Sequence, residues 1–367
     1  MNPFLRKVLH MSKKINLSVY MLLALLVMGV CSSLTAQEPY RVGTTAANFL
    51  EIGVGVAGNA MGDANVALTH DLMSSYWNPA GLGFMKKSEA HFVQQPYVAN
   101  ISMRYAGVGL VLPNIATLAV SVTHMGYGDD MAVTTLAYPE GTGEHYSADD
   151  FAFSLSVGRR LVHWFAFGMT AKFINSQIWH TSGKAAAVDF GAIVNTNFFS
   201  STGNREDGMK IGMSIANYGS GLSYDGIDLY MPIDLSPDEA GNYADVPGKY
   251  KTSRWELPLI FRLGIGLHRQ ITSTQRLSIG VDALHPNNNS EYVNVGGEYQ
   301  ISFSGTGDFF LRGGYKGLGM IDSVFGATFG GGFVMYLSPA VSLKFDYAYR
   351  SLGILGDSNS FGFGVLF

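Results

Sequence analysis

The end of the chain alternates between apolar residues and small or polar residues, and this pattern restricts the fold more than any other feature. Phe361, Phe363, Val365 and Phe367 fall on one face, with small residues between the first three. The run 341–350 likewise alternates Val, Leu, Phe and Tyr with Ser, Lys, Asp and Arg. Successive side chains of a β-strand point to opposite faces, so each run has one apolar face and one polar face.

The same period of two extends from Glu89 to the end of the chain. The segments that follow it are 89–100, 101–112, 116–130, 149–160, 164–179, 184–197, 208–218, 256–269, 275–285, 291–303, 308–316, 325–338, 340–350 and 360–367. This set of about fourteen is even in number, and the two longest connections, near 126–148 and 219–255, fall on the same side of it. Both features are typical of a bacterial outer-membrane barrel. We therefore predict an all-β fold, a transmembrane antiparallel β-barrel over residues 89–367.

The composition agrees with membrane-spanning strands. The chain is 47% hydrophobic and 14% charged, whereas soluble domains carry roughly a quarter charged residues. No apolar stretch after the N-terminus reaches the ~18 residues that a spanning helix needs. The predicted partners of such a chain are the lipid of the outer membrane of a Gram-negative bacterium and the machinery that assembles barrels there. These four apolar residues share one face of the terminal strand: Phe361, Phe363, Val365 and Phe367. We expect them to form the assembly signal.

Residues 1–36 have the order of a secretory signal peptide. Basic residues between positions 6 and 14 precede an apolar stretch from Leu17 to Val30, and Ala36 ends the segment. Cleavage after Ala36 would remove the only cysteine, Cys31, and four basic residues, which leaves 20 Lys and Arg against 28 Asp and Glu. An acidic chain of this kind has no basic surface for nucleic acid. We expect residues 37–88 to form a separate hatch or plug segment before the barrel.

Charged residues recur on the polar face of the predicted strands, where they would face the lumen. They are Lys172, Asp189, Arg262, Asp282, Glu298, Arg312, Lys344 and Asp346, four of each sign. An ion-selective pore is expected to carry charges of one sign. Balanced signs favour a paired network that fills and stiffens the interior, since buried charges need partners.

Motifs for chemistry are weak. The glycines within 53–58 have the spacing of a dinucleotide loop, but no βαβ unit surrounds them. The histidines lack metal-ligand spacing. His180 lies beside the hydroxyls of Thr181 and Ser182 in a predicted surface turn, with no acid nearby in sequence to orient it. We predict that the protein is not an enzyme and has no metal and no cofactor.

The segment before the first strand carries three distinctive motifs: residues 49–55 (FLEIGVG), residues 60–64 (AMGDA) and residues 76–82 (YWNPAGL). In these motifs the chain resembles the N-terminal signature of the PorV/PorQ-type outer-membrane proteins, which are related to FadL-like channels for hydrophobic compounds. The resemblance implies a fourteen-stranded barrel with a hatch inside or below the lumen. It assigns Phe49, Trp77, Asn78, Pro79 and Ala80 to that hatch.

The resemblance leaves two functions open. In the first, the protein is an accessory or adaptor barrel in type IX-like secretion, and its partners are a large secretion translocon or a cargo protein. In the second, it is a FadL-like channel that carries a hydrophobic ligand. A channel hatch should be movable, with apolar residues near Phe49 and Trp77 lining a ligand pocket. An adaptor is expected to have a permanently plugged lumen and apolar loop tips.

Overall fold

The structure is a computed structural model that describes residues 41–128, 130–241 and 245–367. All of them belong to one structural unit, Pro39–Phe367. The predicted signal peptide, residues 1–36, lies outside the described residues. Among the described residues, no helix is long and apolar enough to cross a membrane.

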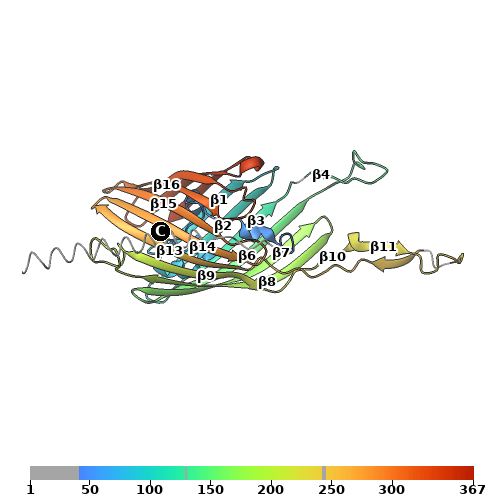
Figure 1. The fold of residues 1–367 in the computed structure, drawn as a ribbon, viewed down its shortest axis with the longest axis horizontal. Helices are drawn as coiled ribbons and strands as arrows, with labels where there is room; N and C mark the ends of the chain where they lie inside the picture. The colour runs from blue at the N-terminus through green and yellow to red at the C-terminus, as the bar shows by residue number, and fades with distance from the viewer. Residues whose placement is uncertain (1–40, 129, 242–244) are drawn as a thin grey trace, which may run out of the picture. The chain divides into compact units, whose positions relative to one another are not determined.

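Fourteen antiparallel strands form a closed barrel (Figure 1). These strands are β1 (Glu89–Pro96), β2 (Ser102–Leu112), β3 (Ala116–Gly126), β6 (Ala148–Val162), β7 (Phe165–Ile178), β8 (Thr181–Asn195), β9 (Met209–Gly219), β13 (Ile260–Thr272), β14 (Gln275–Pro286), β15 (Tyr292–Phe303), β16 (Gly307–Leu318), β17 (Ala327–Tyr336), β18 (Ser342–Ser351) and β19 (Asp357–Leu366). The last strand pairs with the first, because Glu89 lies opposite Leu366, and β8 pairs with β9. The predicted number of strands and their order are therefore confirmed.

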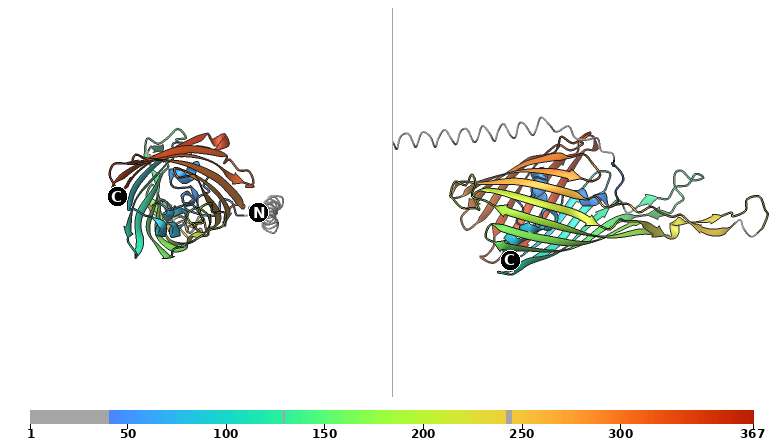
Figure 2. Two further views of the ribbon diagram at one scale, coloured as in Figure 1. Left: turned by 90° about the vertical axis from the view of Figure 1, so that its left-hand side faces the viewer. Right: turned by 60° about the horizontal axis from the view of Figure 1, so that its bottom comes forward.

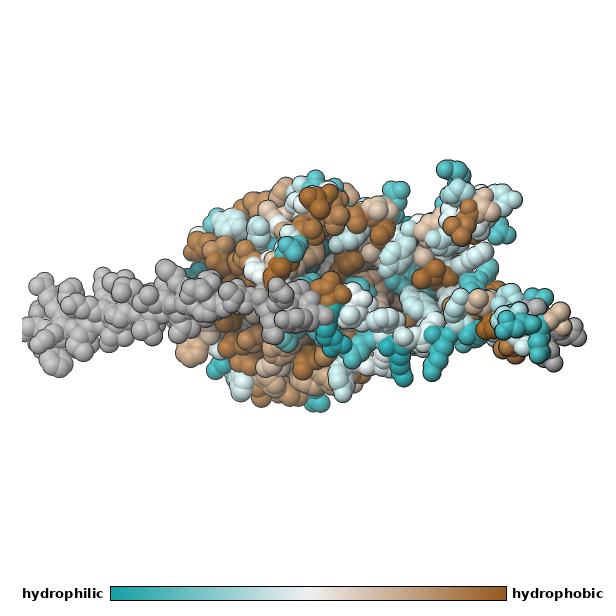
Figure 3. Space-filling model, turned by 45° about the vertical axis from the view of Figure 1, so that its right-hand side comes forward, coloured by the Kyte–Doolittle hydropathy of each residue, from teal (hydrophilic) through white to brown (hydrophobic). Residues whose placement is uncertain are grey.

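The alternation of the sequence becomes an inner and an outer face of the barrel. On β19, Phe361 and Phe363 point outward and are 54% and 40% exposed, whereas Ser358 and Ser360 on the other face are buried. Outward aromatic rings stack across neighbouring strands, as Phe333 does on Phe345 with ring centroids 4.9 Å apart. Figure 3 shows that apolar residues dominate the visible surface over the strands. This apolar surface is the one that a bilayer covers in a membrane barrel.

The connections differ in length at the two ends. The short-turn end contains residues 113–115, 163–164, 196–208, 273–274, 304–306 and 337–341. The long-loop end carries two projecting segments. The first, residues 127–147, holds β4 (Met131–Ala132) paired with β5 (His145–Tyr146), and we call it the first arm.

The second arm, residues 220–259, extends from the same end (Figure 1). It holds β10 (Tyr224–Gly226), η3 (Ile227–Leu229), β11 (Tyr230–Ile233) and β12 (Val246–Lys249). In this arm β11 pairs with β12, and β10 adds to the edge of β8. The loop between β18 and β19 holds the short helix η4 (Gly353–Leu355).

Residues 45–88 precede the barrel and lie inside the ring of strands, as the end-on view shows in blue (Figure 2). We call them the internal segment. It contains η1 (Asn48–Glu51), α2 (Val56–Ala60), α3 (Ser74–Trp77) and η2 (Pro79–Phe84). Its apolar side chains form the main hydrophobic core together with inward residues of the strands. A barrel of this size would otherwise enclose a wet lumen, so the internal segment supplies the core.

Candidate functional site

The residues expected to form a hatch are all buried inside the barrel. Phe49 and Trp77 are each 2% exposed, and Asn78, Pro79 and Ala80 are buried as well. The Asn78 side chain accepts a hydrogen bond from the Ala80 N–H, so it caps η2, and proline fits the first position of that helix. The Asn78 amide also donates to the carbonyl oxygen of Ala192 on β8, at 3.2 Å. This motif thus fixes both a local turn and a contact with the wall.

A row of inward glycines lets the internal segment touch the backbone of the wall. The row crosses eight strands that are consecutive in the sheet and comprises Gly158, Gly168, Gly191, Gly212, Gly266, Gly280, Gly296 and Gly314. Most of these glycines lie directly opposite one another, as Gly280 does to Gly266 and to Gly296.

A side chain on this row would collide with the internal segment. A Cβ atom on Gly168 would lie 2.2 Å from the carbonyl carbon of Pro79, and one on Gly314 would lie 2.3 Å from that of Met61. Such contacts between backbones are possible only where no Cβ is present. The wall of the barrel is therefore shaped to fit this particular segment.

Ion pairs inside the barrel attach the internal segment to the opposite part of the wall. The Asp63 carboxylate lies 2.6 Å from Lys316 Nζ and 3.1 Å from Arg350 Nη2. The Asp71 carboxylate lies 2.6 Å from Lys344 Nζ. Burial alone would raise the pKa of Asp63 and of Asp71, but these cations hold both pKa values below the ordinary range. Both carboxylates are therefore charged near neutral pH and bind the segment to β16 and β18.

The eight charged residues expected to face the lumen lie on the inner face, in separate groups. Lys172 pairs with Asp189 at 2.6 Å. Arg312 pairs with Glu298 at 2.8 Å and with Asp346 at 2.6 Å. These two groups connect strands to strands.

The other three of the eight residues contact the internal segment. Lys344 pairs with Asp71, as described above. The Asp282 carboxylate accepts from the Val66 N–H at 2.8 Å, and Arg262 donates to the Tyr76 carbonyl oxygen at 3.4 Å. The sequence reasoning missed Asp63, because no strand pattern assigns a face to a residue in an irregular segment.

Little space remains where a hydrophobic ligand would be expected to bind. A cavity lined by Phe49, Leu50, Val54, Tyr76 and Tyr105, among others, has a volume of about 20 Å³. A cavity that accepts benzene has roughly 150 Å³. The pocket beside Phe49 therefore has room for a single water molecule and not for an aromatic ring.

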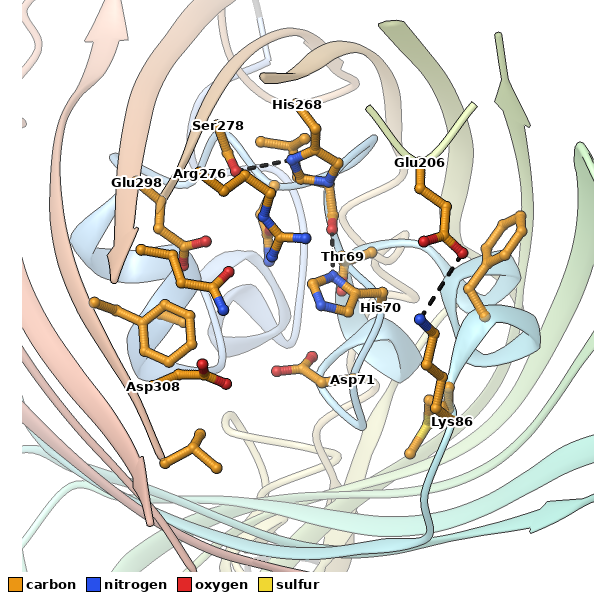
Figure 4. A pocket seen from close by; sticks show the side chains of 18 of the residues that line it. Thr69, His70, Asp71, Lys86, Glu206, His268, Arg276, Ser278, Glu298 and Asp308 are labelled. Carbon is orange, nitrogen blue, oxygen red and sulfur yellow. Dashed lines mark hydrogen bonds and ion pairs between the residues drawn. The ribbon is translucent and has the colours of Figure 1, made fainter. Parts of the chain in front are cut away.

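A larger cavity opens at the short-turn end, beneath the internal segment (Figure 4). Its volume is about 480 Å³. The lining contains eight Lys and Arg residues against five Asp and Glu residues, although the whole chain has more acidic than basic residues. His70 points into it, and burial together with Lys210 lowers the pKa of that imidazole. This part of the lumen is polar and basic.

The two arms carry exposed apolar residues at the long-loop end. In the first arm, Leu136 is fully exposed and Tyr138 is 63% exposed. In the second arm, Ile227, Leu235 and Tyr250 are each more than half exposed. These side chains belong to the arms and not to the strands that form the barrel wall. The exposed apolar surface of the protein is therefore not confined to that wall.

His180 has an acidic partner that the sequence did not reveal. Its Nδ1 lies 3.0 Å from Asp228 Oδ1, and the other oxygen of that carboxylate accepts from the Thr181 hydroxyl. His180 and Asp228 are 48 residues apart in sequence and meet because β10 adds to the edge of β8. The contact fastens the second arm to the rim of the barrel. Among the described residues, no group of three or more His, Cys, Asp or Glu side chains could hold a metal ion.

Comparison with known proteins agrees with this architecture. The family model "Type IX secretion system protein PorV" matches residues 35–237, which is more than half of the chain. The curated proteins contain no significant match.

Solved structures share the fold at low sequence identity. A CymD monoaromatic hydrocarbon channel has a TM-score of 0.51 and 9% identity, and the alignment covers 86% of this chain and 97% of that one. The Ralstonia pickettii toluene transporter TbuX has a TM-score of 0.50 and 10% identity, with the same coverage. The protein described here therefore belongs to the PorV family and is a β-barrel of the outer membrane of a Gram-negative bacterium.

Proposed function

We propose that this barrel is an accessory protein of type IX-like secretion, with a permanently filled lumen and arms that dock a secretion translocon or its cargo. Membership of the PorV family favours this role, because the family model is that of a type IX secretion protein. The observation that carries the proposal is the close fit between the internal segment and the wall. Passage of a ligand along the barrel axis would need that segment to leave.

Three observations support a segment that stays in place. The glycine row lets the segment pack against eight strands. Two carboxylates, Asp63 and Asp71, bind it to β16 and β18. The cavity beside Phe49 is too small for an aromatic ligand. A movable hatch would instead be expected to have few buried charges and a pocket ready for its ligand.

The arms supply surface for a partner. Their exposed apolar residues, such as Leu136 and Leu235, lie on segments that leave the barrel at the long-loop end (Figure 1). Exposed apolar side chains that gather on one surface mark sites where a protein or membrane binds. The second arm also carries several carboxylates, including Asp234, Asp238 and Glu239, so a partner with both apolar and basic groups would match it.

The alternative is a channel for hydrophobic molecules, which the fold shared with the solved CymD and TbuX channels keeps open. The two functions differ in whether the internal segment must move. An engineered disulfide can therefore separate them. A Cβ on Gly362 would lie 3.6 Å from the Cβ of Val56. This distance falls in the disulfide range of about 3.5–4.5 Å.

The experiment compares the double variant Val56→Cys/Gly362→Cys with its two single-cysteine controls in the native host. Cross-linking is verified by the mobility of the unheated protein with and without reductant. If the proposal holds, the oxidised double variant secretes cargo within about twofold of the controls. If oxidation of the double variant stops the uptake of a monoaromatic hydrocarbon and reduction restores it, the protein is a channel and the proposal is wrong.

Docking by the arms is tested separately. Affinity purification should recover a large translocon subunit or cargo with the unmodified protein and much less of it with Leu136→Ser/Tyr138→Ser. Ile354→Ser is a matched control, because Ile354 is an exposed apolar residue in another loop at the same end. Equal recovery with both variants would remove the first arm from the proposed interface.

A further inference from the structure

The cavity at the short-turn end contains cations that the barrel does not neutralise. Its five acidic side chains all have partners: Asp71 with Lys344, Glu89 with His91, Glu206 with Lys86, Glu298 with Arg312 and Asp308 with Tyr336. Among the described residues, neither Lys210 nor Arg276 forms an ion pair. Other lumen cations, such as Lys172, do have a carboxylate within 4 Å.

Lys210 and Arg276 line the same cavity from the two strands that flank β13. Lys210 on β9 lies opposite Gly266 of β13, and Arg276 on β14 lies opposite Gln270 of β13. All of these positions share the inner face with His268. The Arg276 Nε atom is buried and has no hydrogen-bond partner. A buried donor without an acceptor is unfavourable, so Arg276 has hydrogen-bonding capacity that the described residues do not use.

Two imidazoles complete the surroundings (Figure 4). His268 Nδ1 is 2.8 Å from the Ser278 hydroxyl, and His70 Nδ1 is 2.9 Å from the Leu68 carbonyl oxygen. In each ring these contacts use Nδ1, which leaves Nε2 for another partner. Two cations and two ring nitrogens therefore line one side of a cavity of about 480 Å³.

We propose that this cavity is an anion site in which Lys210 and Arg276, flanked by His70 and His268, bind a phosphate group. Arginine and lysine are the usual phosphate ligands in proteins, the first through its planar pair of N–H donors and the second as a point charge. A phosphate carries about −1.5 to −2 charge near pH 7, which is opposite in sign to these two cations. The group can belong to free phosphate or to the head of a phospholipid. The site stands apart from the proposed secretion role, since it lies at the opposite end from the arms.

The test uses the purified full-length barrel in a neutral detergent. Isothermal titration with sodium phosphate, at an ionic strength held constant with sodium chloride, should give saturable binding. Because a hydrogen bond to a charged group contributes about 1.5 kcal/mol or more, Arg276→Gln and Lys210→Gln should each weaken binding about tenfold. Arg269→Gln is the matched control, since Arg269 lies on the outer face of β13 and is exposed.

A second measurement separates the two sources of the phosphate group. Native mass spectrometry with dioleoyl phosphatidate, and with phosphatidylcholine as the zwitterionic control, would retain phosphatidate on the unmodified protein if the ligand is a lipid head group. Retention that both variants lose supports the site with a lipid occupant, and binding of inorganic phosphate alone supports it with a free anion. The proposal is overturned if neither probe binds saturably, or if both folded variants bind as tightly as the control. The two substitutions lie on different strands. If one variant fails to fold, the same comparison is made with the other variant alone.

Discussion

Neutralising Asp63 should strongly destabilise the barrel. In the substitution Asp63→Asn, the carboxylate that faces Lys316 and Arg350 is lost, and both cations remain where their side chains are at most 5% exposed. Removing one partner from a buried pair costs about 3–5 kcal/mol, because the remaining charge is left uncompensated. Asparagine is the right replacement, since Asp63 has a φ of 64° and asparagine tolerates this left-handed conformation.

The matched control is Asp225→Asn in the second arm. Asp225 also pairs with a lysine, Lys249, but its side chain is 73% exposed. Exposed pairs contribute about 0–1 kcal/mol. Unfolding in urea, in lipid vesicles, can be followed by tryptophan fluorescence, to which the buried Trp77 of the internal segment contributes. A loss of about 4 kcal/mol corresponds to roughly a thousandfold change in the unfolding equilibrium for Asp63→Asn, and little change is expected for the control.

The pH dependence provides an internal check on the cause. The pKa of Asp63 is lower in the folded protein than in the unfolded chain, so its charge stabilises the fold above the ordinary carboxyl pKa. That contribution disappears as the pH falls through the lowered value. The unmodified protein should therefore approach Asp63→Asn in stability below about pH 4. If the two proteins differ by less than 1 kcal/mol at pH 7, the internal segment does not depend on this carboxylate.

Three further substitutions test other parts of the structure. Gly168→Val places a Cβ 2.2 Å from the Pro79 carbonyl carbon and should lower the free energy of unfolding by more than about 1–3 kcal/mol. In the same urea assay, Gly297→Val should leave that free energy nearly unchanged, because its Cβ would meet its nearest neighbour at 3.5 Å. Deleting Phe367 removes its two backbone hydrogen bonds to Ser88, so we expect the amount of folded barrel in outer-membrane fractions to fall; an unchanged amount would contradict its role in assembly. Asp207→Ala removes a carboxylate that accepts hydrogen bonds from backbone N–H groups of the β8–β9 turn and of Gln270, and these bonds lower its pKa. Protease cleavage within 196–208 should therefore become faster. Equal rates would show that the turn keeps its structure without this carboxylate.

The barrel was predictable from the sequence because its physical cause is local. Each strand must present apolar residues to lipid at every second position, so the alternation can be read one segment at a time. The ends of the predicted strands differ from the observed ones by a few residues, as at 89–100, where β1 ends at Pro96. Proline has no N–H to donate, so it falls naturally at the end of a strand. The strand predicted to begin at residue 256 starts at Ile260, since residues 256–259 belong to the second arm.

The interior was predictable only in part, because its contacts join residues far apart in sequence. The pattern placed Lys344 and Arg312 on the polar face of their strands, yet it did not identify Asp71 or Asp346 as their partners. The glycines of the row were visible at inward positions. Their meaning required the path of the internal segment, which follows neither a period of two nor a helical period. His180 and Asp228 likewise meet only through the pairing of β10 with β8.

The cost of moving the internal segment can be set against the two functions. Withdrawing it breaks the pairs of Asp63 and Asp71 together and leaves Lys316 and Arg350 inside the barrel without the Asp63 carboxylate. A buried charge without its partner is strongly destabilising, so these contacts oppose withdrawal. A channel would have to recover that energy from ligand binding, yet the pocket beside Phe49 offers about 20 Å³. An adaptor needs no opening, and for it the same contacts only keep the barrel rigid beneath its arms.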